Sequence, residues 1–111
     1  MKPNTIQKVK DGYQFFVYPD IKKEPLGVSK KIYAAFSECQ RAYEEFASYV
    51  KRNGLDHPDE TNIKIETRKN GDINLYYFHY YIGTEEVFCR IKGYWQKAGC
   101  IKGIKSVYKN L

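Results

Sequence analysis

The predicted fold depends on residues 62–95, which read NIKIETRKNGDINLYYFHYYIGTEEVFCRIKGYW. The run holds three stretches typical of strands, at 62–69, 73–82 and 87–95, because each is rich in β-branched and aromatic residues and is bounded by turn residues. Asn70-Gly71 is a strong hairpin signal, since a type I′ turn needs positive φ at both central positions. The stretch therefore predicts a three-stranded antiparallel meander.

Counting outward from the two turns predicts which side chains share a face. With Asn70-Gly71 as a two-residue loop, Ile65 faces Tyr76; with Thr84-Glu85 at the centre of the next turn, Tyr80 faces Cys89. Both registers place apolar residues on one face. That predicted core face comprises Ile63, Ile65, Tyr76, Phe78, Tyr80, Ile82, Val87, Cys89 and Ile91.

A helix is predicted at about 38–52. Ser37 and Gln40 have the spacing of a capping box, and Gly54 is placed to end the helix. Apolar side chains recur at helical spacing on one side, which suits a helix that covers the apolar face of the sheet. These residues are Cys39, Ala42, Tyr43, Phe46, Ala47 and Val50.

The remaining segments complete an α+β fold with one antiparallel sheet of three to five strands. Residues 13–18 and 31–36 are strand candidates that we expect to form a hairpin, and residues 101–109 predict a short C-terminal helix. We see no internal repeat, and 111 residues is a common size for one domain, so residues 1–111 are predicted to form a single domain.

The net charge is unevenly distributed along the chain. Residues 1–86 hold 13 Lys and Arg against 13 Asp and Glu, whereas residues 87–111 hold six basic residues and no acid, so this last stretch carries the whole net charge of +6. Such a segment attracts nucleic acid, acidic proteins or anionic surfaces, although basic ends also serve solubility.

The second face of the predicted meander alternates aromatic and basic residues. The same registers pair His79 with Arg90 and Tyr77 with Lys92. Nucleic acid requires cations for phosphates and flat rings for bases, and this face with the basic C-terminal segment supplies both. The alternatives are that another segment covers the face or that it forms a dimer interface. The predicted nucleic-acid-binding residues are Lys64, Tyr77, His79, Arg90, Lys92, Tyr94, Lys97, Lys102, Lys105 and Lys109.

Catalysis, cofactor binding and metal binding lack a matching motif. His57 precedes Pro58 in a turn-like segment, and His79 and Cys89 are predicted on opposite faces of the sheet, which argues against a nucleophile pair. The three cysteines have no zinc-site spacing, so we expect reduced thiols in a cytoplasmic protein, and the N-terminus lacks the apolar run of a signal peptide. No stretch has the length of a membrane span.

The order of elements resembles two classes of small module. The strand pair before Phe36, Ser37, Gln40 and Ala42 is similar to the sheet-and-helix DNA-binding modules of mobile-element integrases, and the later elements resemble double-stranded-RNA-binding domains. Element order alone does not carry function. We therefore assign no family. From the aromatic and basic sheet face and the basic C-terminal segment we predict a non-catalytic nucleic-acid-binding protein. The alternative is a protein-interaction module or inhibitor, monomeric or homodimeric, that acts on an acidic or nucleic-acid-handling partner.

Overall fold

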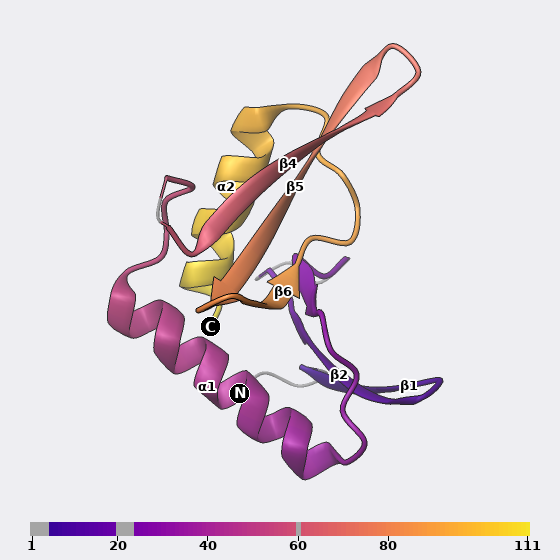
Figure 1. Cartoon of the computed structure of the whole chain (residues 1–111), viewed down its shortest axis with the longest axis vertical. Helices are drawn as coiled ribbons and strands as arrows, with labels where there is room; N and C mark the ends of the chain where they lie inside the picture. Colours follow the sequence, from indigo (N-terminus) through magenta and orange to yellow (C-terminus); the bar gives the residue numbers. More distant parts are fainter. Residues whose placement is uncertain (1–4, 20–23, 60) are drawn as a thin grey trace.

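The computed structural model describes residues 5–19, 24–59 and 61–111. Each helix follows three strands, and Figure 1 shows the long β4–β5 hairpin crossing α2 and extending beyond it. The elements are β1 (Ile6–Val9), β2 (Gly12–Val17), β3 (Gly27–Ser29), α1 (Phe36–Asn53), β4 (Ile63–Asn70), β5 (Ile73–Ile82), β6 (Glu85–Cys89) and α2 (Lys97–Lys109).

The six strands form one antiparallel sheet in the order β1-β2-β3-β6-β5-β4. Both helices pack on the same face of it, because their buried residues share one core with alternate residues of β2, β5 and β6. Phe46 of α1 contacts the rings of Phe15, Tyr80 and Phe88, and the Tyr80 hydroxyl donates to the carbonyl of Ile104 in α2 at 3.3 Å. The other face of the sheet carries no described helix.

The chain consists of two similar β-β-β-α halves, β1–α1 and β4–α2, although the sequence showed no repeat. In each half a tyrosine of the second strand pairs with a tyrosine before the helix: Tyr13 with Tyr33, and Tyr76 with Tyr94. Cys39 and Cys100 are both fully buried in the first turn of their helices. The two cysteines are 61 residues apart in the sequence, and Tyr33 and Tyr94 have the same separation. The palindromic strand order places β3 and β6 together at the centre.

The predicted α+β class is confirmed, but the strands differ from the prediction. The sheet has six strands rather than three to five, because β1 and the three-residue β3 were missed. The predicted strand 31–36 is wrong: that segment contributes a single bridge at Tyr33, and α1 begins at Phe36. The third predicted strand of the meander ends at Cys89 rather than Trp95. The C-terminal helix is present and begins at Lys97, four residues earlier than predicted.

The predicted strand pairings are also wrong, and a β-bulge explains the largest error. Between β4 and β5, Ile65 pairs with Phe78 instead of Tyr76, so the loop of this hairpin is Gly71-Asp72 rather than Asn70-Gly71. The register differs by two residues, so each side chain stays on its predicted face. In β6, Glu86 pairs with Tyr81 but Phe88 pairs with Tyr80, which leaves Val87 as an extra residue. The extra residue inverts the side-chain alternation. Phe88 therefore lies in the core, and Cys89 lies beside His79 on the other face.

Candidate nucleic-acid interface

The sheet face opposite the helices, called the open face below, is the first candidate surface. A row of paired residues crosses five strands on it, and its non-basic members are half-buried rather than covered. Two aromatic rings on the face lie under cations: the Arg68 guanidinium is 4.2 Å from the Tyr77 ring, and the Lys64 ammonium is 5.1 Å from the Tyr81 ring. The row comprises Phe16, Val28, Cys89, His79 and Lys64.

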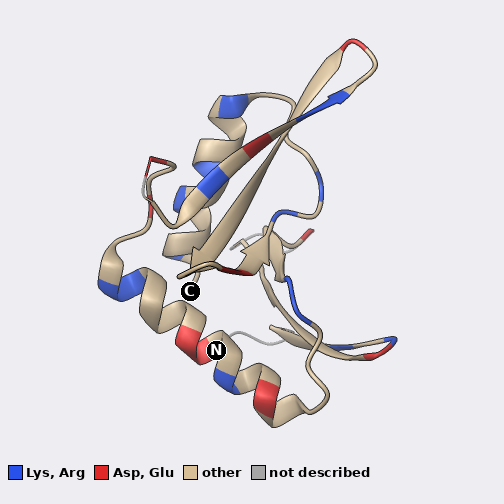
Figure 2. Cartoon of the chain, in the orientation of Figure 1, with Lys and Arg blue, Asp and Glu red and all other residues tan. Residues whose placement is uncertain are grey.

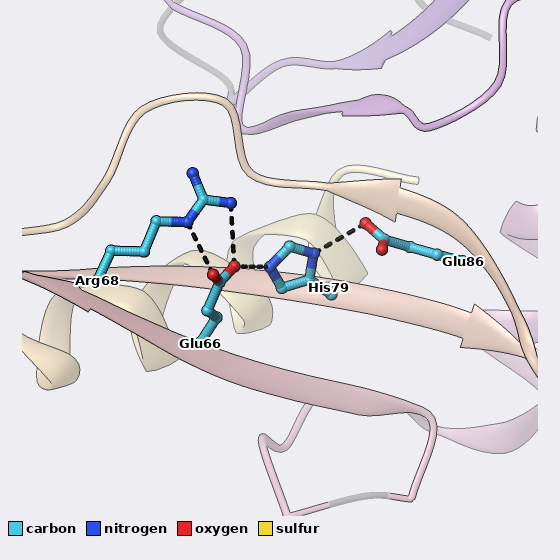
Figure 3. A network of polar contacts seen from close by, with 4 residues as sticks. All are labelled: Glu66, Arg68, His79 and Glu86. Carbon is cyan, nitrogen blue, oxygen red and sulfur yellow. Dashed lines mark hydrogen bonds and ion pairs between the residues drawn. The ribbon is translucent and has the colours of Figure 1, made fainter.

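A charged network spans β4, β5 and β6 on the open face (Figure 3). His79 Nδ1 lies 2.8 Å from a Glu86 oxygen, and His79 Nε2 lies 2.8 Å from a Glu66 oxygen. The ring can donate to both carboxylates only when both of its nitrogens carry a proton. Arg68 donates two further hydrogen bonds to Glu66, at 2.8 and 3.0 Å. Hydrogen bonds from Arg68 and His79 lower the pKa of Glu66 to about 2.

The bulge places Cys89 next to this network, contrary to the prediction that Cys89 and His79 lie on opposite faces. Burial raises the pKa of the Cys89 thiol, and the nearby Glu86 carboxylate raises it further. Both nitrogens of His79 are engaged by the carboxylates of Glu66 and Glu86. The arrangement holds charges in place and lacks an activated nucleophile.

The predicted binding residues do not form one surface. Lys64, Tyr77 and His79 lie on the open face. Lys92 is exposed in the segment between β6 and α2, where its ammonium lies 3.6 Å from Glu24. The four predicted lysines of α2 lie beyond the opposite face of the sheet, because α2 packs on that side.

Arg90 and Tyr94 hold the segment before α2 in place. The Arg90 guanidinium donates to the main-chain carbonyls of Lys92, Leu26 and Pro25 at 2.6, 2.9 and 3.2 Å, and its central carbon lies 4.1 Å from the centre of the Tyr94 ring. The predicted pairing of His79 with Arg90 is wrong, since His79 pairs with Cys89. The predicted pairing of Tyr77 with Lys92 is also wrong, because β6 ends at Cys89.

The lysine face, formed by Lys97, Lys102, Lys105 and Lys109 of α2, is the second candidate surface. All four side chains are exposed, and none is ion-paired with another described residue. Lys102, Lys105 and Lys109 lie on the side of α2 opposite its buried residues, and Lys97 is exposed in the first turn. Figure 2 shows only basic residues among the charged positions of α2, and both signs on α1.

A groove beside the β4–β5 hairpin is the third candidate surface, and the prediction of binding residues missed most of it. Trp95 is 73% exposed, Ile91 52% and Ile73 41%. Gly93 lets the backbone approach the sheet, because a Cβ there would lie 2.8 Å from Leu75 and 2.9 Å from the Tyr77 ring. We call this the Trp95 groove; it is lined by Asn70, Ile73, Leu75, Tyr77, Ile91, Lys92, Gly93 and Trp95.

The comparisons with known proteins add no further evidence. No family model matches the chain, and no curated protein or solved structure is detectably similar to it. Neither α1 nor α2, the helices of the described residues, has the length and apolar character that a bilayer span requires. Within the described residues, no group of His, Cys, Asp and Glu has the geometry of a metal site.

Proposed function

We propose that this protein binds nucleic acid without catalysing a reaction, and that the lysine face supplies the main contacts with phosphates. The observation that carries the proposal is the charge of α2: four exposed lysines and no acid in 13 residues. Exposed lysines on one side of a helix neutralise phosphates and release their counterions, which is the dominant source of sequence-independent affinity.

The first half of the molecule shows that the fold does not require this charge. In α1, which occupies the corresponding position, Glu38, Glu44 and Glu45 balance Arg41, Lys51 and Arg52, giving 3 − 3 = 0. Lys97 is also at the first position of α2, where the helix dipole favours an acid and disfavours a cation. A helix that accepts this cost and carries no compensating acid suits an anionic ligand.

The open face and Lys92 provide a secondary contact area. Arg90 and Tyr94 hold in place the segment that carries Lys92. His79 is held by two carboxylates and Cys89 is not activated, which favours binding over catalysis. The three cysteines are unpaired, in keeping with a cytoplasmic protein.

The test is a salt titration of binding. Labelled single strands of about 16 nucleotides and the matching duplex are titrated with protein between about 50 and about 200 mM salt, and anisotropy gives the affinity. We expect log affinity to fall linearly with log salt. The triple variant K102Q/K105Q/K109Q removes three phosphate contacts, so the slope should become shallower by about 2 for single strands and about 3 for the duplex.

The matched control removes the same charge from the first half. K10Q/K30Q/K31Q changes three exposed lysines outside α2 and should leave the slope nearly unchanged. Equal effects of the two triple variants would show that net charge, not the lysine face, determines binding. Absence of binding to every strand at low salt would refute the proposed function.

A further inference from the structure

The fold does not require the exposed tryptophan of the Trp95 groove. Counting from the paired tyrosines and cysteines, position 95 in the second half corresponds to position 34 in the first, which is Ala34. The two positions precede the helix N-caps Ala35 and Gln96, which have similar extended backbone angles. The same local structure thus forms with alanine, so the indole at position 95 is not needed for packing.

The groove has the chemistry of a base-stacking platform. Leu75 and Tyr77 line it, and the Arg68 guanidinium lies over the Tyr77 ring. Lys92 also lines it. The side chains of Lys92 and its ion-pair partner Glu24 are 71% and 61% exposed, so a phosphate can displace the carboxylate at little cost. A flat exposed ring beside a replaceable cation contact binds a base and its phosphate together.

We infer that the Trp95 groove takes an unpaired base of single-stranded nucleic acid, stacked on the indole, with Lys92 on an adjacent phosphate. This inference rests on the proposed function and narrows it to strands with accessible bases. In a duplex both faces of each internal base are already stacked, so Trp95 has no ring to stack on. The lysine face then supplies affinity for any strand, and the groove supplies the preference for single strands.

Trp95 is the only tryptophan of the chain, so its fluorescence reports on this groove directly. We expect single strands to quench it with the same midpoint that anisotropy gives, and a duplex to quench it much less. W95A should weaken single-strand binding about tenfold and leave duplex binding nearly unchanged. W95F retains a ring and should restore part of the affinity. K92Q should weaken single-strand binding, whereas K31Q, the corresponding change in the first half, should not.

The control for loss of an exposed aromatic ring is F36A, at the start of α1, where Phe36 is 47% exposed. If W95A binds single strands as tightly as the unaltered protein while K102Q/K105Q/K109Q still weakens binding, the inference is refuted and the proposed function stands. If light scattering shows a dimer that W95A converts to a monomer, the groove is a contact between two copies and the inference is refuted. If no strand binds at all, the proposed function itself fails.

Discussion

Alanine at Gly103 should destabilise the protein, whereas alanine at Gly99 in the same helix should stabilise it. A Cβ at position 103 would lie 2.7 Å from Cζ of Tyr94, and the hydroxyl oxygen of that ring would be closer still. A Cβ at position 99 would meet the Tyr94 ring at 3.4 Å, which is an ordinary contact. The tyrosine cannot retreat easily, because Arg90 lies against its ring and Phe78 packs beside it.

The sign follows from two opposing contributions. Replacing a helical glycine by alanine stabilises a helix by up to about 1 kcal/mol. Forcing an extra methyl group into a packed site costs about 1 to 3 kcal/mol, and displacing Tyr94 also disturbs the Arg90 contacts. We therefore expect G99A to gain up to about 1 kcal/mol of unfolding free energy and G103A to lose about 1 to 2 kcal/mol.

Urea unfolding followed by far-ultraviolet circular dichroism measures both variants. Tyr94→Phe removes the hydroxyl oxygen, so it should relieve part of the cost of G103A, and a double-mutant cycle gives the coupling. Because Tyr94 precedes Trp95, G103A should also shift the tryptophan emission of the folded protein, while G99A should not. A G103A variant that is as stable as the unaltered protein would refute this account of how α2 holds the segment before it.

Two further predictions concern the charged contacts. The pKa of Glu66 falls from 4.5 to about 2 in the folded protein, so its carboxylate stabilises the fold above pH 4.5 and this stabilisation is lost as the pH falls toward 2. E66Q should therefore have a lower free energy of unfolding than the unaltered protein at neutral pH, and this difference should shrink as the pH falls from 4.5 toward 2. A difference that stays constant with pH would contradict the reasoning. E44Q, at an exposed position of α1, is the control. Arg90→Lys cannot make all three main-chain hydrogen bonds, so it should lower the unfolding free energy by about 1 to 3 kcal/mol, while Arg41→Lys on the exposed side of α1 should change it little.

Local patterns were sufficient to predict the helices and the β4–β5 hairpin. The apolar spacing of Cys39, Tyr43, Phe46 and Val50 marked the buried side of α1, and these four residues are its buried residues. The C-terminal helix was also predicted despite its glycines. Gly103 makes room for Tyr94, which packs against α2 from the segment before it, so a residue that weakens the helix locally is required by a contact that the sequence alone does not show.

The composition of the open face could not be predicted because it depends on the bulge at Val87. Strand alternation assigns Glu86 and Cys89 to opposite faces, and no glycine or proline in Glu85–Cys89 signals an extra residue. The repetition of the β-β-β-α half could not be predicted either, because few residues are the same in the two halves. Between residues 31–50 and 92–111, only the pairs Lys31/Lys92, Tyr33/Tyr94 and Cys39/Cys100 are identical, because packing fixes a few positions and leaves the surface free to change.

The two halves therefore act as an internal comparison for function. The tyrosine before each helix and the buried cysteine in its first turn are the same in both halves, whereas other buried positions, such as Tyr43 and Ile104, differ. Two surface features distinguish the second half: Trp95 instead of Ala34, and a lysine face on α2 instead of the balanced charges of α1. The corresponding parts of the first half lack these features, so the fold does not require them, and this is the reason for proposing a ligand for the basic segment 87–111. Exchanging Trp95 with Ala34 tests that argument, because A34W/W95A keeps the composition and should lose the preference for single strands.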